Sequence, residues 1–433
     1  MAPTNNITQS FPPEAPLFPE AELIRFIAPF FERRQDFMAL LHNHPAPLYL
    51  LDPEVLLERA SQFRQAFSDI CPRTSYYFAV KSNNCPRVSE ILVGAGLGLD
   101  VSSGQELTMA LDLGAQEIIF SGPGKTDAEL ELAVKNHHRV TILIDSFLEL
   151  ERLAKIATGQ GVTIQAGVRL TTNPEGLWRK FGIPLADLAR FFLNAEQLPA
   201  VNLAGLQFHT SWNLGPEAQV RFIKILGPIL AALPERHRQA LQFLDIGGGY
   251  WPPQGEWLQE AGTPAGGVRK ALDPDSPPSN NRYRIESRPI EFFATTIAPV
   301  LREEILSQLS CRICFEPGRW ICNDAMHLLL TVIDKKGDDL VITDGGTNTV
   351  GWERFEIDYF PVLNLSRPAL TERKCHILGS LCTPHDVWGY SYWGEDIQPG
   401  DILMIPTQGA YTYSLRQNFI KPLPEVVEME RKN

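Results

Sequence analysis

The chain has 433 residues, of which 44% are hydrophobic and 21% are charged, and its formal net charge is −12. This length predicts two or three domains, or one large barrel with an addition. The acidic balance, without a long run of Lys or Arg, argues against nucleic acid as the main partner, and no apolar stretch approaches the roughly 20 residues needed to cross a bilayer.

The N-terminal segment lacks the charged start and apolar core of a signal peptide, so we expect a flexible lead-in and a cytoplasmic protein. The seven cysteines, an odd number, favour free thiols. Cys311 and Cys314 have C-x-x-C spacing, but their segment alternates like a buried strand and no second pair follows. We therefore predict no metal site.

Apolar, strand-like runs recur along the chain with helix-like segments between most of them. Eight alternating β and α units favour a closed (β/α)8 TIM-like barrel, and periodicity alone leaves a doubly wound open sheet as the alternative. A further run at 47–52 precedes the barrel and is expected to join a second sheet. The eight runs are 75–80, 97–101, 117–120, 140–145, 163–170, 201–208, 243–247 and 312–316.

The connection between the seventh and eighth runs, 252–288, is long and rich in Pro, Gly and Ser. We interpret it as a loop excursion without regular elements, either a lid over the substrate or a mobile surface loop. After Arg319, short strand-like runs broken by turn signals predict a β-rich domain, a sandwich or a barrel. We expect an N-terminal extension over 1–47 that partly joins the β domain, a barrel over 48–318 and a β domain over 319–433.

Polar residues and glycines collect where the predicted barrel strands end, which is where barrel enzymes place their sites. Glycine N–H groups and an arginine fork bind anions, and the loops after strands 7 and 8 often bind phosphate. A lysine amine can form a Schiff base with an aldehyde. Together these groups predict a pyridoxal 5′-phosphate (PLP) site, although singly each is compatible with a structural role. They are Lys81, Asp100, Arg169, His209, Gly247, Gly248, Gly249, Glu316, Gly318 and Arg319.

The chain resembles the fold-type III PLP-dependent decarboxylases, the group of ornithine and diaminopimelate decarboxylases. The resemblance implies an alanine racemase-like fold, a PLP cofactor and a homodimer with shared active sites. Matching segments run in family order over nearly the whole chain. They are YYFAVKSNN (76–84), GLDVSSGQEL (98–107), FSGPGK (120–125), FGI (181–183), GLQFH (205–209), DIGGGY (245–250), FEPGR (315–319), DGG (344–346), GSLCTPHD (379–386) and GAYT (409–412).

The resemblance also implies residue roles. Lys81 would carry the cofactor as an internal aldimine, His209 would stack on its ring, and Asp100 would lie beneath it. Glu316 would pair with the pyridine nitrogen, and Cys382 would reach across the dimer to protonate the substrate carbon after carbon dioxide leaves. The phosphate would be held by Gly247, Gly248, Gly249, Gly318, Arg319 and Tyr411.

Glu316 favours decarboxylation, because a carboxylate beside the ring nitrogen keeps that nitrogen protonated and the ring a strong electron sink. Racemases of similar fold place an arginine there. A racemase or epimerase is therefore one alternative, and a non-catalytic regulatory homologue is another. The presence of Lys81, Cys382 and Tyr411 argues against the regulatory alternative.

The sequence departs from the family at the substrate end of the site. Trp212 stands where the family has a small residue and is expected to reshape the pocket, and Thr383 stands where diaminopimelate decarboxylases have an acid. The C-T-P-x-D pattern resembles relatives that act on larger or carrier-bound substrates. Diaminopimelate-like, siderophore-precursor and carrier-bound amino acids all stay open as substrates. The candidate substrate contacts are Arg169, Thr383, Asp386 and Arg354.

Overall fold

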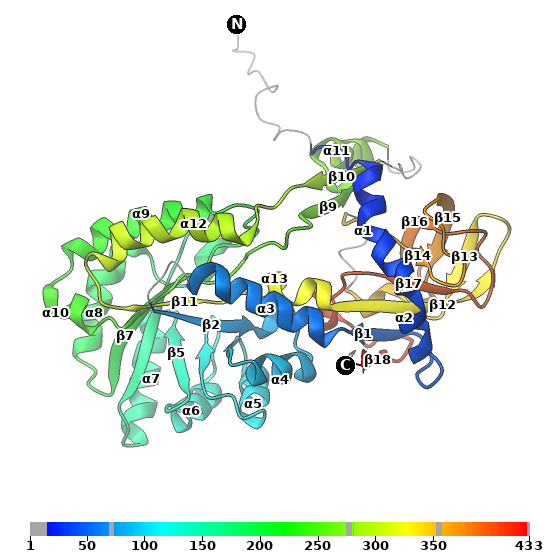
Figure 1. The fold of residues 1–433 in the computed structure, drawn as a ribbon. Coiled ribbons are helices and arrows are strands. Elements are labelled where there is room, and N and C mark those ends of the chain that lie inside the picture. Colours follow the sequence, from blue (N-terminus) through cyan, green and yellow to red (C-terminus); the bar gives the residue numbers. More distant parts are fainter. Residues whose placement is uncertain (1–14, 69–72, 274–278, 280, 352–356, 431–433) are drawn as a thin grey trace, which may run out of the picture.

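The protein forms a closed parallel barrel beside a separate β domain (Figure 1). Each of the eight predicted barrel runs coincides with an observed strand to within two residues at either end. The predicted fold class is confirmed, and the open doubly wound sheet is wrong. The computed structural model describes residues 15–68, 73–273, 279, 281–351 and 357–430.

All neighbouring strands of the barrel are parallel, and the barrel closes where β11 pairs with both β8 and β2. The strands are β2 (Thr74–Ala79), β3 (Gly98–Val101), β4 (Ile118–Phe120), β5 (Val140–Ile144), β6 (Ile164–Leu170), β7 (Val201–Phe208), β8 (Phe243–Asp245) and β11 (Arg312–Phe315). The helices around them are α3 (Pro53–Ser68), α4 (Pro86–Gly94), α5 (Gly104–Asp112), α6 (Asp127–Lys135), α7 (Phe147–Gly159), α8 (Leu188–Glu196), α9 (Glu217–Ala232), α10 (Glu235–Ala240) and α12 (Ile290–Leu301).

Four of the barrel helices, α3, α5, α6 and α7, begin at a side chain that caps their first N–H groups. The Asp52 carboxylate accepts the first backbone N–H groups of α3, from Glu54 and Val55. Thr126 and Glu129 form a capping box at the start of α6, which satisfies N–H groups that have no partner inside the helix. Helix α3 then buries apolar residues three or four positions apart against the strands, as a surface helix does.

An apolar layer closes one end of the barrel interior. It consists of Tyr77, Ile119, Leu143, Phe243 and Cys314, all buried. The Phe243 ring packs directly against Gly205. A Cβ at Gly205 would lie 2.1 Å from this ring, so a larger residue there would displace it. Side chains alternate along a strand, so residues two positions further on from this layer also point inward, one layer nearer the C-terminal ends of the strands.

The β domain contains an eight-stranded sheet in the order β13-β15-β16-β14-β17-β12-β1-β18. Strand β12 also pairs with β13, so part of this sheet closes on itself. The strands are β1 (Leu48–Leu51), β12 (Met326–Lys335), β13 (Leu340–Thr343), β14 (Leu363–Asn364), β15 (Glu372–Leu378), β16 (Val387–Trp393), β17 (Ile402–Ile405) and β18 (Glu425–Glu428).

The run before the barrel joins this sheet as predicted, since β1 lies between β12 and β18. Residues 48–51 therefore belong to the β sheet, although they fall inside the range expected for the barrel. Two N-terminal helices, α1 (Glu20–Glu32) and α2 (Arg34–Leu40), pack on the same sheet through Leu23, Ile27 and Phe37. The remaining limits of the three domains stay a prediction.

The connection 252–288 contains regular elements, so its interpretation as a plain loop is wrong. Strands β9 (Glu256–Gln259) and β10 (Arg282–Ile285) form an antiparallel pair, and α11 (Pro264–Leu272) lies between them in sequence. This insertion extends from the barrel toward α1 (Figure 1). The ring of Phe18 lies 4.7 Å from that of Trp257, and Leu17 forms a β-bridge with Tyr283, so the N-terminal segment covers the insertion.

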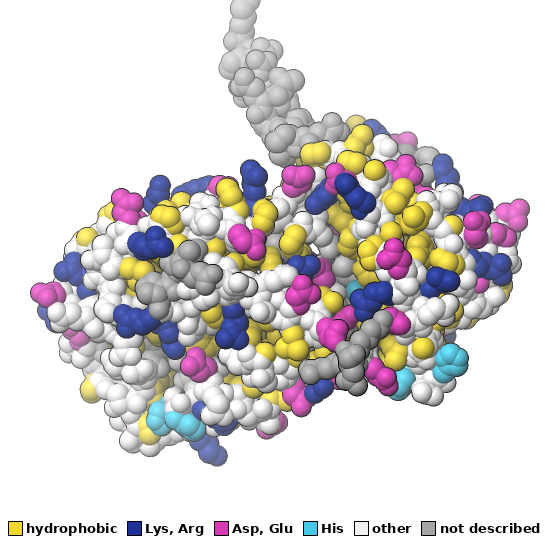
Figure 2. Space-filling model, viewed as in Figure 1, with side chains coloured by type: hydrophobic (Ala, Val, Ile, Leu, Met, Phe, Trp, Pro, Cys, Tyr) yellow, Lys and Arg dark blue, Asp and Glu magenta, His cyan; other side chains and the backbone are white. Residues whose placement is uncertain are grey.

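Figure 2 shows acidic and basic side chains interspersed over the visible face. Within the described ranges, no helix has the length and apolar character needed to cross a membrane. The described cysteines are unpaired thiols, and Cys71 lies outside the described residues. Cys311 and Cys314 are both buried at β11.

Candidate active site

A polar layer follows the apolar layer of the barrel on the same inward face. Gln207 comes two residues after Gly205, Asp245 two residues after Phe243, and Glu316 two residues after Cys314. These three polar side chains are each at most 1% exposed. The change from apolar to polar along the inward face places the chemistry at the C-terminal ends of the strands, as the sequence predicts.

Lys81 follows β2 on a short 3-10 turn, Val80–Ser82, and its amine faces this polar layer. Its Nζ lies 2.6 Å from Oδ2 of Asp100, whose other oxygen accepts a hydrogen bond from the Ser121 hydroxyl at 2.5 Å. Burial and the charge of Glu316 raise the pKa of Asp100 to about 6, although Lys81 acts in the opposite direction. Burial disfavours the charged amine of Lys81, but Asp100 and Glu316 outweigh it and raise its pKa.

His209 and Glu316 lie side by side next to Lys81. His209 Nδ1 is 3.6 Å from Glu316 Oε2 and accepts the Gly248 N–H at 3.2 Å. Burial, with the positive charges of Lys81 and Arg169, lowers the pKa of His209 and favours a neutral ring. Burial disfavours the Glu316 carboxylate, but the neighbouring His209 ring and the positive charges of Lys81 and Arg169 outweigh this effect and lower its pKa to about 2.

Asp245 is a second buried carboxyl group beside Glu316. Its Oδ1 accepts the Gly247 N–H at 2.8 Å. Burial and the negative charge of Glu316 raise the pKa of Asp245 well above its usual value. Two carboxyl groups in one dry site do not both ionise readily, so Asp245 holds a proton while Glu316 carries the charge.

A glycine-rich wall follows β8. Gly247 and Gly249 have φ values of +69° and +80°, which side chains other than glycine rarely adopt. A Cβ at Gly248 would lie 2.1 Å from the carbonyl oxygen of Glu316, so only glycine fits there without a backbone shift. The Arg319 guanidinium lies 4.3 Å from the ring centroid of Trp251 and 4.9 Å from that of Tyr411, which fixes a cation next to this wall.

A cavity of about 370 Å³ opens at this end of the barrel. Its lining includes most of the predicted cofactor residues, from both the barrel and the β domain. It also includes residues that were not predicted, of which Trp251 was detectable because it comes two residues after the glycine run. The predicted cofactor residues in the lining are Lys81, His209, Gly249, Glu316, Gly318, Arg319 and Tyr411, and the residues that were not predicted include Ser211, Trp251, Glu256, Ile357 and Asp358.

Trp212 lines the cavity, as expected from its unusual position in the sequence. Its indole N–H donates a hydrogen bond to the Glu256 carboxylate at 3.1 Å. Glu256 belongs to β9, so the insertion supplies part of the cavity wall. This contribution was not predicted, since nothing in the local sequence of 252–288 indicates where it folds back.

The structure does not bring the described candidate substrate residues, Arg169, Thr383 and Asp386, into this cavity. Arg169 donates to the Ser121 carbonyl oxygen at 3.2 Å and lies over the Phe181 ring. The buried Asp386 carboxylate accepts backbone N–H groups of Thr347 and Leu381, at 2.7 Å each, so it organises its own loop.

Cys382 and Thr383 lie in the same loop of the β domain, between β15 and β16, and Cys382 is exposed. Neither residue lines the cavity of its own chain. Arg354 lies outside the described residues.

These groups fit PLP chemically. Lys81 supplies an amine for the aldehyde. The glycine wall, which a Cβ would obstruct, and Arg319 supply N–H groups and a positive charge for a phosphate. Glu316 supplies a buried carboxylate of depressed pKa for the pyridine nitrogen.

Comparison with known proteins agrees with this site. Residues 54–323 match the family "Pyridoxal-dependent decarboxylase, pyridoxal binding domain". The "L-glutamyl-[BtrI acyl-carrier protein] decarboxylase" of Niallia circulans is 26% identical over 424 residues, which cover 92% of this chain and 91% of that protein. The "2-[(L-alanin-3-ylcarbamoyl)methyl]-2-hydroxybutanedioate decarboxylase" of Staphylococcus aureus is 25% identical, covering 93% of this chain and 98% of that protein.

Among solved structures, diaminopimelate decarboxylase from Helicobacter pylori, complexed with L-lysine, has the same fold. Its TM-score is 0.75 at 22% identity, and the match covers 92% of this chain and 94% of that chain. The family match spans more than half of the sequence and includes Lys81, the glycine wall and Glu316. The chain therefore belongs to the pyridoxal-dependent decarboxylases, and it is an amino-acid decarboxylase with PLP as its cofactor.

Proposed function

We propose that the chain decarboxylates an amino acid that is joined at its far end to a larger molecule, either an acidic conjugate or a carrier protein. The observation that carries the reaction type is the meeting of the Lys81 amine, the Glu316 carboxylate and the glycine–arginine wall at one cavity. Free diaminopimelate is the competing substrate.

Two observations support a conjugated substrate. By their names, the relatives from Niallia circulans and Staphylococcus aureus act on a glutamyl group on a carrier protein and on an amide of a hydroxybutanedioate. The second observation is Thr383, which stands where an acid would bind the far amine of diaminopimelate. Losing a buried charge partner for that amine shifts specificity by a large factor.

When bound, PLP withdraws electrons from the substrate α-carbon and so stabilises the charge left by departing carbon dioxide. Lys81 would hold the cofactor through its ε-amine, and the Asp100 carboxylate, 2.6 Å from Nζ, would bind that amine when it is not attached to the cofactor. Glu316 would pair with the ring nitrogen and keep a proton on it, because an adjacent carboxylate favours the charged form. Neutral His209, which lines the cavity, would lie against the ring and exclude water from that face.

Gly249 and Gly318, which line the cavity, would hold the phosphate together with Arg319 and Tyr411. The N–H groups of Gly247 and Gly248 donate to Asp245 and His209, so these two glycines would shape the phosphate wall by their lack of a side chain. Cys382 supplies the proton that replaces the lost carboxylate, in the active site of the other subunit of a homodimer. Its exposure supports this role, as does its absence from the cavity of its own chain. The dimer and a cytoplasmic location are both part of this proposal.

Borohydride reduction tests the attachment site. The purified holoenzyme should lose its visible absorbance on reduction and yield one modified peptide that carries PLP on Lys81. Lys81→Ala should give no reduced adduct and should lose activity by about 10³-fold or more. Lys125→Ala is not a suitable control because that side chain is fully buried, whereas the exposed Lys224→Ala should keep the adduct. An adduct on any lysine other than Lys81 would contradict the assignment.

A carbon-dioxide release screen tests the reaction and the substrate class together. The panel contains diaminopimelate, ornithine, citryl-linked amino acids and aminoacyl groups on a carrier protein. We expect release from the conjugated members and little from free diaminopimelate. Exchange of the α-hydrogen for deuterium without carbon dioxide release would show a racemase instead. If no member of the panel releases carbon dioxide and Lys81→Ala retains the biological activity, a regulatory role would be favoured.

A hybrid dimer tests the shared site. Lys81→Ala and Cys382→Ala are each expected to be inactive, and mixing them under subunit exchange should restore up to about a quarter of the activity, because one of the two sites in each mixed dimer contains both residues and about half of the dimers are mixed. Cys375→Ala, which alters a buried cysteine elsewhere in the β domain, is the control for nonspecific effects. No recovery after confirmed exchange would count against the role of Cys382.

A further inference from the structure

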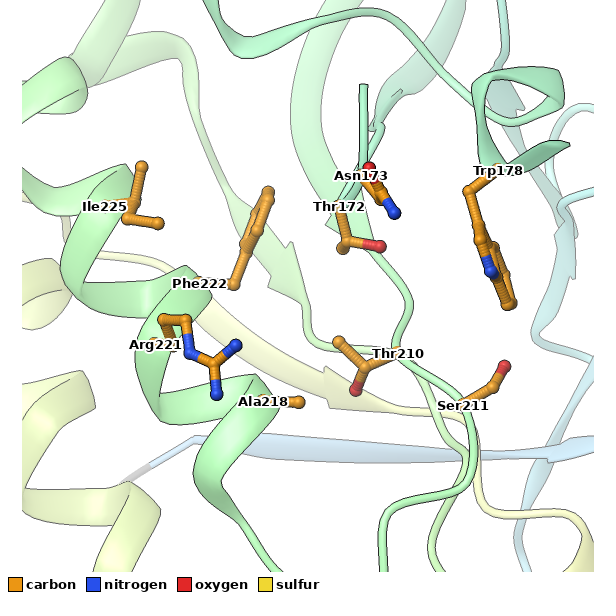
Figure 3. A pocket seen from close by; sticks show the side chains of 9 residues that line it. All are labelled: Thr172, Asn173, Trp178, Thr210, Ser211, Ala218, Arg221, Phe222 and Ile225. Carbon is orange, nitrogen blue, oxygen red and sulfur yellow. The ribbon is translucent and has the colours of Figure 1, made fainter. Parts of the chain in front are cut away.

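A second cavity, of about 260 Å³, lies beside the cofactor cavity. It occupies the space between the segment after β6, which carries Trp178, and helix α9 (Figure 3). Ser211 lines both cavities, and Thr210 and His209 precede it on the same loop, with His209 facing the cofactor cavity. The second cavity therefore borders the cofactor cavity at Ser211, two residues after His209.

The lining of the second cavity combines an apolar wall with a polar floor. Trp178 is 40% exposed and Ile225 is 50% exposed, which is high for large apolar side chains. The floor contains the hydroxyls of Thr172 and Thr210. The Thr172 hydroxyl donates to the His209 carbonyl oxygen, and the Thr210 hydroxyl accepts from the Asn213 amide. Such a mixture of apolar surface and a few placed polar groups is typical of small-molecule sites.

Arg221 is the charged group of this cavity. Its side chain extends from α9 into the space facing Thr210 (Figure 3). Within the described part of the chain, no carboxylate pairs with its guanidinium, whereas Arg190, Arg236 and Arg152 on neighbouring helices each pair with an acid at 3.1, 2.6 and 2.7 Å. An available guanidinium at the edge of an apolar cavity is suited to bind a carboxylate or phosphate in a two-pronged manner.

The surroundings strengthen the positive potential. Arg179, Lys180 and Lys224 are exposed on the two elements that border the cavity, and Glu175 and Glu217 are the acids nearest in sequence. The local balance is thus positive on a chain whose net charge is −12. A cationic patch of this kind on an acidic protein attracts anions selectively to that place.

We propose that the second cavity binds a remote anionic group of the substrate, with Arg221 as its anchor. This inference rests on the proposed function, because a conjugated amino acid has its amine at the cofactor and its other end several bonds away. The anion is either a carboxylate of a free acidic conjugate or the phosphate of a carrier arm. Both chemistries need the same guanidinium, while the apolar wall packs against the intervening chain.

Binding of small probes to the holoenzyme tests the proposal without turnover. The probes are citrate for the free conjugate, 4′-phosphopantetheine for the carrier arm, and pantetheine as the uncharged match of the latter. At constant ionic strength, at least one anionic probe should bind about tenfold or more tighter than pantetheine, as expected for a charge-assisted contact. Preference for citrate indicates a free conjugate, and preference for 4′-phosphopantetheine indicates a carrier arm.

Arg221→Gln should remove this preference, and Arg221→Lys should keep part of it because the charge remains without the planar fork. Lys224→Gln is the matched control, since it removes one exposed positive charge from the same helix outside the cavity lining. With the substrate found in the carbon-dioxide screen, Arg221→Gln should raise KM about tenfold and leave kcat within about twofold, as for lost binding that is equal in both states.

Three results would overturn the subsite: no anion binds better than pantetheine, Arg221→Gln leaves the affinity unchanged, or Lys224→Gln weakens binding as much as Arg221→Gln does. The proposed function fails separately. Arg221-dependent anion binding by a protein that releases no carbon dioxide would refute the decarboxylation of conjugates and retain the subsite. Carbon dioxide release from a conjugate with an unchanged KM in Arg221→Gln would support the proposed function and refute the subsite.

Discussion

Replacing Lys81 by methionine isolates the energetic cost of its ion pair. The change removes the cation 2.6 Å from Asp100, whose side chain is fully buried and gains no water in exchange. Removing one partner of a buried pair costs ~3–5 kcal/mol, and we expect the lower end, about 3 kcal/mol, because 33% of the Lys81 side chain is exposed. The double variant Lys81→Met/Asp100→Asn should recover most of this loss.

Both proteins are compared after removal of PLP, so that cofactor binding does not contribute to the apparent stability. Urea unfolding followed by circular dichroism gives the free energy difference. In calorimetry the unfolding entropy is about 0.9 kcal/mol/K for a chain of this length, so the melting temperature should fall by roughly 3 °C. A double variant as unstable as Lys81→Met alone would refute the pairing argument.

The loss should also depend on pH. The pKa of Asp100 is about 6, raised by burial and by Glu316, and removing Lys81 raises it further because Lys81 favours the charged form. A carboxyl group with a raised pKa contributes stability below its unfolded pKa and loses that contribution as pH rises through its folded pKa. The deficit of Lys81→Met should therefore be small near pH 5 and grow toward pH 8, and an equal deficit at both would contradict the assignment.

Three further changes test other parts of the site. Gly248→Ala should weaken PLP binding by about tenfold or more in fluorescence titrations, because the new Cβ would lie 2.1 Å from the Glu316 carbonyl oxygen, whereas Gly124→Ala has no atom within 4 Å and should bind normally. Lys125→Met should lower the free energy of unfolding in urea by ~3–5 kcal/mol, because it leaves the Glu149 carboxylate buried without its partner. A loss under about 1 kcal/mol would show that the surroundings of Glu149 rearrange to solvate it. Asp245→Asn should gain stability relative to wild type as pH rises from about 5 to 8, since burial and Glu316 raise the pKa of Asp245 and its contribution is lost with rising pH; parallel pH profiles would count against this.

The barrel was predictable because its strands are buried on both faces and therefore read as apolar runs. The run at 201–208 coincides with β7, and polar or glycine residues directly after the runs mark the site. Asp245 was missed as a member of the polar layer, although it lies two residues after Phe243 and shares its inward face. Strand periodicity alone would have placed it beside Glu316.

Other elements depend on partners far away in sequence. Strand β16 (Val387–Trp393) contains glycine, serine and aromatic residues and was not predicted, because its pairing with β15 and β14 supplies its stability. Strands β9 and β10 are four residues each and pair across a long interval. Asp386 shows the same limit for function, since its closeness to Cys382 in sequence does not reveal that its carboxylate binds loop backbone.

The contact between α1 and the insertion has a practical consequence for handling the protein. Arg284 of β10 pairs with Glu22 of α1 at 2.5 Å, and the adjoining strand carries Glu256 into the wall of the catalytic cleft. Helix α1 thus holds in place the strand pair that forms part of the cleft wall. We expect an affinity tag or a protease cut near Glu20 to alter turnover without touching a reacting group, so tags should be removed or separated by a spacer before kinetic comparisons.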